Sequence, residues 1–132
     1  MSTRKINQKQ IEAVLALPAA KRYDHFIKLV ADWQELWGLY NDGWAMAATE
    51  SGEPVFPMWP AEEYAARCIA EQWIGYLPEK FSLDELQTEL LPKLKKDGIL
   101  PGVFFLPSDK GITPTVDELQ NDLKAELDKY SD

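Results

Sequence analysis

The segment from Trp37 to Trp73 constrains the fold most strongly, because it holds four of the five tryptophans of the chain. Its first part reads W-G-L-Y-N-D-G-W-A-M-A-A-T, and its second part reads V-F-P-M-W-P-A-E-E-Y-A-A-R-C-I-A-E-Q-W. An Asn-Asp-Gly turn, a Ser-Gly turn and a Trp-Pro helix start separate these apolar stretches. The pattern predicts a hairpin, a further strand and a helix in succession, and it indicates no reaction.

The hairpin is predicted from residues 36–40 and 44–48, which flank the turn Asn41-Asp42-Gly43. Glycine supplies the positive φ that a tight hairpin turn requires. The next strand is expected at Val55–Trp59, after the turn at residues 50–53. Pro54 and Pro57 cannot donate ladder hydrogen bonds, so we expect this strand to lie at a sheet edge or to be broken.

Helices are predicted before and after these strands from apolar spacing and from capping residues. Two amphipathic helices are expected between Asn7 and Trp33, and a third is expected from Pro60 to about Trp73. Two capping boxes, Ser82–Glu85 and Thr115–Glu118, open two further helices. Pro92 should kink or break the first of these near Leu91, and Gly98 should end it. The apolar run within residues 99–106 predicts a buried strand.

This order of elements favours an α+β fold, because the strands cluster and do not alternate regularly with helices. We expect a small, mainly antiparallel sheet of about four strands covered by four to five helices. Residues 7–130 are predicted to form a single domain, with flexible termini at residues 1–6 and 131–132.

Composition excludes several classes of function. The formal net charge is −8, and residues 41–92 carry two Lys or Arg against ten Asp or Glu. Such a chain lacks the basic stripe that binds nucleic acid, and its acidic surface favours a basic protein partner. No apolar run reaches the roughly 20 residues that span a bilayer, so no membrane association is expected. One cysteine and no secretory signal indicate a cytoplasmic protein.

Catalytic and metal-binding motifs are absent from the sequence. It contains no phosphate-binding glycine loop and no nucleophile elbow. One cysteine and one histidine cannot assemble a structural zinc site, so no metal and no cofactor are expected. Cys68 lies on the apolar face of its predicted helix and His25 lies in mid-helix, so we expect structural roles for both. The sequence therefore predicts a non-enzymatic protein.

The tryptophans are the strongest candidates for a binding surface. One interpretation is that they pack the sheet against its helices. The other is that Trp44 and Trp59 line an aromatic groove whose rim carries carboxylates, because Trp anchors are typical of binding hot spots. Glu62 and Glu63 also lie in the first turn of a predicted helix, where they complement its dipole. The candidate interaction surface comprises Trp44, Trp59, Asp42, Glu50, Glu53, Glu62 and Glu63.

Five segments carry a resemblance to a known family. They are L-P-A-A-K-R-Y-D-H-F at residues 17–26, W-G-L-Y-N-D-G-W at 37–44, F-P-M-W-P-A-E-E-Y-A at 56–65, and F-S-L-D-E-L followed by L-L-P-K-L-K-K-D-G-I-L. Together they resemble the small bacterial family catalogued as domain of unknown function twenty-seven-fifty, over roughly residues 7–130. The resemblance implies a stand-alone bacterial protein of one domain, and it brings no activity, substrate or catalytic residue.

Three functional hypotheses follow. The first is a cytoplasmic protein that binds a basic protein partner through its acidic, tryptophan-rich surface; neutralising a toxin or nuclease, as an immunity protein does, is one version of it. The second is a small-molecule-binding protein or minor hydrolytic enzyme with a carboxylate pocket near Asp42, Glu62 and Tyr64. The third is a homodimer formed through the proline-rich strand.

Overall fold

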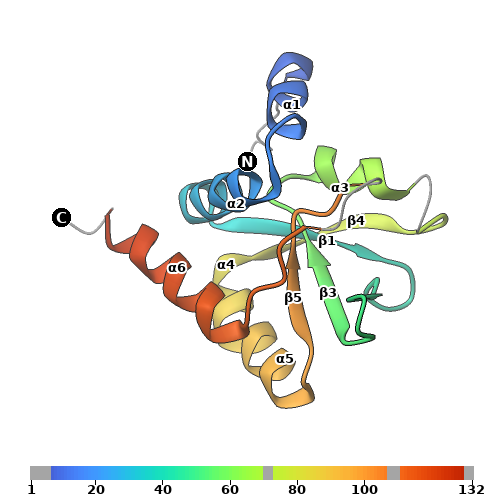
Figure 1. Cartoon of the computed structure of the whole chain (residues 1–132), viewed down its shortest axis with the longest axis vertical. Helices are drawn as coiled ribbons and strands as arrows, with labels where there is room; N and C mark the ends of the chain where they lie inside the picture. The colour runs from blue at the N-terminus through green and yellow to red at the C-terminus, as the bar shows by residue number, and fades with distance from the viewer. Residues whose placement is uncertain (1–6, 70–72, 107–110, 130–132) are drawn as a thin grey trace.

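Five strands form two small sheets that meet at one point (Figure 1). The computed structural model of the chain describes residues 7–69, 73–106 and 111–129. The strands are β1 (Glu35–Tyr40), β2 (Ala47–Ala48), β3 (Pro54–Met58), β4 (Leu77–Ser82) and β5 (Leu100–Val103). The helices are α1 (Gln8–Leu15), α2 (Ala19–Trp33), α3 (Glu62–Ile69), α4 (Leu83–Glu85), the π-helical η1 (Leu86–Leu90), α5 (Leu91–Asp97) and α6 (Val116–Asp128). This arrangement confirms the predicted α+β class.

The two sheets are joined by a backbone contact between two tryptophans. β1 pairs antiparallel with β4, while β3 lies between β2, which is antiparallel to it, and β5, which is parallel. The backbones of Trp37 and Trp59 exchange two hydrogen bonds of 2.8 Å. β1 therefore follows β2 along the same edge of β3, and the order across the sheet is β4, β1, β3 and β5.

The predicted hairpin is wrong beyond its turn. Asp42 (φ 55°) and Gly43 (φ 150°) form the turn, and Tyr40 and Trp44 make a single antiparallel bridge. The chain then diverges to pair as β2 with the start of β3. β1 takes a six-residue register with β4 instead, from Glu35 opposite Ser82 to Tyr40 opposite Leu77. That non-local pairing supplies a full ladder, and the sequence pattern did not reveal β4.

The proline-rich strand, expected at a sheet edge or broken, is neither: β3 runs without interruption from Pro54 to Met58 and is central in its sheet. Pro57 falls between the β2 pairing, which ends at Val55, and the bridge at Trp59. Backbone groups two residues apart in a strand point to the same side. Because the backbone of Trp59 bonds to β1, the nitrogen of Pro57 points to that side as well, where it lies between the β2 pairing and the Trp59 bridge. A missing N–H costs no ladder hydrogen bond at that position.

The helix boundaries follow the predicted capping residues. Asn7 accepts a hydrogen bond of 2.8 Å from the Gln10 N–H, and both predicted capping boxes are present. Gly98 ends α5 in the left-handed region, with φ 71°. Pro92 does not break the helix, which runs from α4 through η1 into α5. The Leu91 N–H donates to the Leu86 carbonyl, so a π-turn absorbs the proline.

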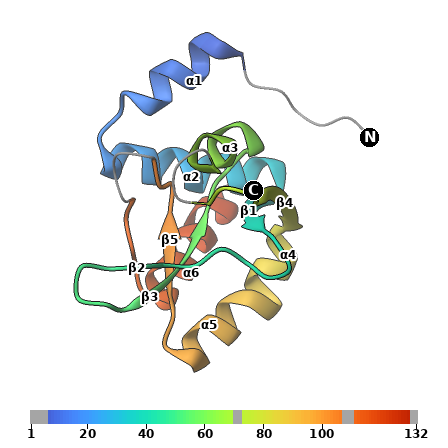
Figure 2. The ribbon, with the colours of Figure 1, turned by 90° about the vertical axis from the view of Figure 1, so that its right-hand side faces the viewer.

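The core lies between the strands and the helices α2, α3, α5 and α6 (Figures 1 and 2). Its largest fully buried side chains are Trp59, Tyr64, Phe26, Phe104 and Phe105. α1 packs against α2 at the periphery. None of the helices in the described ranges has the length and apolar character to cross a membrane. The predicted flexible termini, and the end of the third predicted helix at residues 70–72, fall outside the described residues.

Candidate functional site

Trp59 is part of the core, which corrects its prediction as a surface residue. Its side chain is 0% exposed, and its indole Nε1–H donates a hydrogen bond of 2.8 Å to the Phe105 carbonyl. The ring of Trp73 packs edge-on against it with centroids 6.1 Å apart. A buried indole with a satisfied N–H is a packing element. Trp59 therefore cannot line a groove that a partner enters.

Trp44 is half-buried and sits at the centre of an aromatic cluster. Its ring centroid lies 5.2 Å from that of Tyr40, 5.5 Å from that of Phe81 and 5.5 Å from that of Phe56. Gly38 makes this arrangement possible, because a Cβ there would come within 2.9 Å of Trp44 Cζ3. The indole N–H of Trp44 has no hydrogen-bond partner among the described residues. The ring is therefore packed by its neighbours, while its N–H is not used in any bond to the described residues.

A hollow of about 220 Å³ opens beside this cluster, between β4 and the helix that follows it. We call it the Trp44 hollow, and it is lined by Trp44, Phe81, Glu85, Glu89, Leu90 and Lys93. The two rings and the leucine give it apolar walls, while the charged side chains belong to one helical segment. The Trp44 hollow is thus an aromatic site with a charged rim.

The rim of the Trp44 hollow carries an uncompensated carboxylate. Glu85 Oε1 accepts the Ser82 N–H at 2.9 Å, as part of the capping box. The carboxylate of Glu89 makes no hydrogen bond or ion pair with any described residue. Lys93, one turn further on, pairs with Asp97 at 3.5 Å, and no ion pair between Lys93 and Glu89 occurs in the described structure. The lining of the hollow therefore carries two carboxylates and one ammonium group beside the aromatic rings, a net negative charge.

The other predicted surface residues lie elsewhere. Asp42 is exposed on the turn after β1, and Glu50 is exposed on the turn before β3. Glu53 borders a different hollow, which also contains Asp117 and Lys95. Glu62 and Glu63 are half-buried in the first turn of α3, as helix-dipole compensation requires. Of the predicted set, only Trp44 lines the Trp44 hollow.

The alternative carboxylate pocket near Asp42, Glu62 and Tyr64 is not supported by the position of Tyr64. That side chain is 0% exposed, and its ring packs on Phe104 with centroids 4.7 Å apart. Burial, followed by the nearby Glu63 carboxylate, raises the pKa of the Tyr64 hydroxyl to about 12. A tyrosine sealed in this way cannot exchange a proton with a surface ligand near neutral pH.

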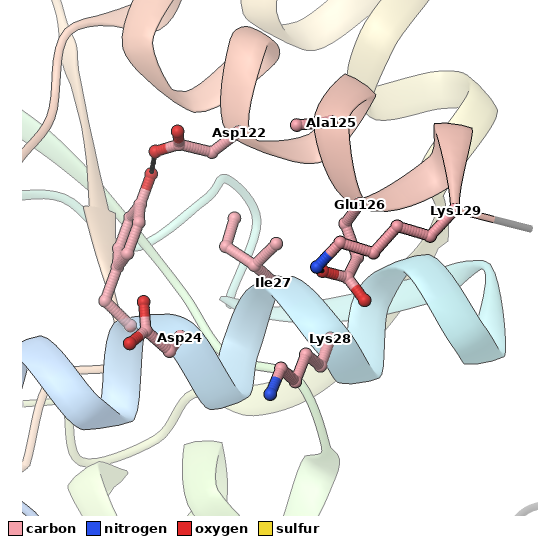
Figure 3. Close-up of a pocket in the computed structure, with 8 residues that line it drawn as sticks. Asp24, Ile27, Lys28, Asp122, Ala125, Glu126 and Lys129 are labelled. Atoms are coloured by element: carbon pink, nitrogen blue, oxygen red, sulfur yellow. Dashed lines mark hydrogen bonds and ion pairs between the residues drawn. The ribbon is translucent and has the colours of Figure 1, made fainter.

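A larger hollow, of about 320 Å³, lies between α2 and α6 (Figure 3). At one end the Tyr23 hydroxyl donates to Asp122 at 2.5 Å, and at the other end Lys129 pairs with Glu126 at 3.1 Å. Burial and the Asp122 carboxylate raise the pKa of Tyr23. These polar groups already satisfy one another across or along the helices, so this hollow is a helix–helix seam.

Burial shifts the pKa values of both Cys68 and His25 toward their neutral forms. Cys68 is buried, with its Sγ 3.4 Å from the Phe105 carbonyl, and burial raises the pKa of its thiol to about 12. Burial, followed by the charge of Lys28, lowers the pKa of His25. No group of three potential metal-ligating side chains occurs in the part of the chain that the structure describes. A thiol so protonated is not a nucleophile near neutral pH.

Sequence reasoning missed Phe81 and Glu89, which complete the Trp44 hollow. Phe81 lies on β4, whose sequence L-P-E-K-F-S is poor in strand-forming residues. Glu89 belongs to a helix that was predicted, but nothing in the sequence places that helix beside Trp44. The segment offers no clear strand signal, because Leu77 and Phe81 are its only apolar residues besides Pro78 and are four positions apart.

Comparison with known proteins identifies the family of the chain. A family model described as "Protein of unknown function (DUF2750)" matches residues 23–123. This match covers more than half of the sequence, so the chain belongs to the DUF2750 family. The matched region contains every residue of the Trp44 hollow. No curated protein and no solved structure matches the chain.

Proposed function

We propose that this chain is a non-enzymatic protein-binding module whose Trp44 hollow receives a cationic side chain of a partner protein. The observation that carries this proposal is the proximity of a partly exposed tryptophan to the carboxylate of Glu89. Among the described residues, neither the Trp44 N–H nor the Glu89 carboxylate has a hydrogen-bond or ion-pair partner. Neither group is needed for the packing of the fold in the way that Trp59 is.

The chemistry of the Trp44 hollow suits arginine or lysine. A guanidinium or ammonium group over an indole face is attracted by the ring quadrupole, by about 0.5–2 kcal/mol depending on desolvation. The alkyl stem of such a side chain can lie along Phe81 and Leu90 while its head reaches a carboxylate. Arginine fits best, because its planar group both stacks on rings and forks to carboxylates.

Size and charge support a side chain as the occupant. The hollow measures about 220 Å³, below the roughly 300–1,000 Å³ of drug-sized ligand sites. The net charge of −8 would draw a basic partner toward the chain and raise its association rate at low ionic strength. A basic cytoplasmic protein is therefore the partner that we propose.

The test compares two peptides that differ in one charge. Acetyl-Gly-Arg-Gly-amide and the same peptide with citrulline, which is neutral and of the same shape, are titrated into ¹⁵N-labelled full-length protein. We expect the arginine peptide to shift the indole resonance of Trp44, and the citrulline peptide to shift it several-fold less.

Two glutamate variants complete this design. Glu89→Gln should weaken the response of Trp44 to the arginine peptide, because it removes the unpaired rim charge. Glu53→Gln, an equal change in net charge on an exposed residue outside the hollow, should leave the response unchanged. Equal responses to both peptides, or equal losses in both variants, would contradict the proposal.

A further inference from the structure

Large apolar side chains are exposed at the open end of the β1–β4 pair. Leu77 is 69% exposed, Ile74 is 76% exposed and Tyr40 is 42% exposed. Tyr40 and Leu77 are directly opposite each other in the register, so their side chains share one face of the sheet. We call these three residues the ribbon tip. Exposed aliphatic side chains that gather in this way mark interaction sites.

The ribbon tip is continuous with the Trp44 hollow. Leu77, Glu79 and Phe81 alternate along β4 and therefore point to the same face of the sheet. Phe81 lines the hollow, and the Tyr40 ring contacts the Trp44 ring edge-on. Four residues of strand separate Leu77 from Phe81, a span of about 13 Å. One face thus offers an apolar contact at one end and a cation site at the other.

The outer edge of β4 is closed to an added strand. The backbone of Trp37 bonds to Trp59, so Lys80, which is opposite Trp37, directs its own N–H and C=O away from β1. By the same alternation, the backbone groups of Pro78 and Ser82 also point away from β1. Pro78 has no N–H, and the Ser82 N–H donates to Glu85. Of these three outward-facing positions, only Lys80 has a backbone N–H that could bond to an added strand.

We propose that the partner docks as an amphipathic helix across this face, with an apolar residue on the ribbon tip and an arginine or lysine in the Trp44 hollow. The inference rests on the proposed function, since it uses the same cation site. A helix satisfies its own backbone groups, so it needs nothing from the closed edge of β4. The exposed Glu79 lies between the two contacts and favours a basic helix face.

The spacing in the partner follows from helix geometry. Residues seven apart lie on the same helix face and are about 10.5 Å apart along its axis. The reach of an arginine or lysine side chain covers the rest of the 13 Å span. Residues five apart point to different sides of a helix, since each residue turns it by about 100°. A partner helix should therefore carry its leucine and its arginine at positions i and i+7.

The experiment uses two fluorescein-labelled, alanine-based helical peptides of identical composition. One peptide carries leucine at i and arginine at i+7, and the other carries the arginine at i+5. Fluorescence anisotropy with the full-length protein gives the dissociation constant of each. We expect the i+7 peptide to bind at least about tenfold more tightly, since only it can make both contacts.

Protein variants separate this inference from the proposed function. Leu77→Asn should abolish the preference for the i+7 peptide, and Leu77→Ile should keep it; circular dichroism checks that both are folded. Equal affinities for the two peptides, with Trp44→Ala weakening both and Leu77→Asn weakening neither, would overturn the helix inference and leave the proposed function standing. Binding that is insensitive to Trp44→Ala would overturn both.

Discussion

Trp44 and Trp59 come from the same tryptophan-rich segment, yet they have opposite environments. The Trp59 ring is fully buried, and its N–H is bonded to the Phe105 carbonyl. The Trp44 ring is partly exposed and contacts the rings of Tyr40, Phe56 and Phe81, and its N–H has no partner in the described part of the chain. Trp59 is therefore a structural residue, and Trp44 is available for binding.

The difference arises from strand position. Trp59 follows the central strand β3, where β1 and β5 flank it and α3 begins shortly after it. Trp44 follows a turn at the end of β1 and folds back over Gly38, where only the glycine leaves room for a ring. Tryptophans from one segment of sequence can thus be core residues or surface residues, depending on the position of the strand next to them in the sheet.

The largest expected effect distinguishes the two tryptophans by stability. Trp59→Ala should lower the free energy of unfolding by about 3–5 kcal/mol, because it leaves a cavity and removes the indole hydrogen bond to the Phe105 carbonyl. Trp44→Ala should cost about 2 kcal/mol, less than Trp59→Ala because the Trp44 side chain is partly exposed. Urea unfolding monitored by circular dichroism measures both. Equal losses would contradict the contrast.

The buried core should also respond to alkaline pH. Burial raises the pKa of Tyr64 from 10.0 and that of Cys68 from 9.0, each to about 12. Both groups keep their protons in the folded state where the unfolded chain loses them, so stability is complete below pH 9 and falls as pH rises toward 12. By pH 11 we expect a loss on the order of 1 kcal/mol from Tyr64 and on the order of 2–3 kcal/mol from Cys68, whose pKa in the unfolded chain is lower.

The matched variants for this effect are Tyr64→Phe and Cys68→Ala. Each should flatten the decline in unfolding free energy between pH 9 and pH 11, because each removes one titrating group. Thermal unfolding followed over that range gives the slope. A decline that is unchanged in the double variant would show that these two groups are not its source.

Gly38→Ala should damage the Trp44 side selectively. The added Cβ would come within 2.9 Å of the Trp44 ring, so the ring must shift, at a cost of about 1–3 kcal/mol. The arginine peptide should then bind several-fold more weakly, while the Trp59 indole resonance keeps its chemical shift. Unaltered arginine binding in a folded Gly38→Ala protein would show that the position of the ring is unimportant.

The smallest expected effect comes from the capping box beside the hollow. Ser82→Ala removes the acceptor for the Glu85 N–H, which lies 3.0 Å from the Ser82 hydroxyl, and should cost about 1 kcal/mol of stability. Thr115→Ala makes the same change at the start of α6, away from the hollow. Both should destabilise similarly in urea, but only Ser82→Ala should alter arginine binding, because it loosens Glu85.

Local sequence rules predicted the parts of the fold that depend on neighbouring residues. Asn7, Ser82, Thr115 and Gly98 mark helix ends because their side chains or backbone act within one turn. The partner of β1 could not be predicted, since it lies some forty residues further along a stretch that is poor in strand-forming residues. The turn Asn41–Gly43 suggested a hairpin, but a turn fixes a change of direction and not a ladder.

The candidate site could be predicted only in part. An acidic, aromatic surface at Trp44 was expected and remains our proposal, but its carboxylates come from the helix after β4 and not from Asp42, Glu50 or Glu53. Placing Trp59 on the same surface as Trp44 was wrong. The sequence does not show that β3 is a central strand, and that central position is what buries Trp59. The structure also removes the reason for expecting a homodimer through β3, because that strand lies inside its sheet.

Hydrogen exchange of the indole N–H groups tests the contrast between Trp44 and Trp59 most directly. In ¹⁵N-labelled protein transferred to D₂O, we expect the Trp44 indole signal to vanish within the dead time, because its N–H bonds to none of the described residues. The Trp59 signal should persist and decay only through opening of the fold, because its N–H is bonded to Phe105. Rapid loss of the Trp59 signal, or lasting protection of Trp44 in the free protein, would contradict the account.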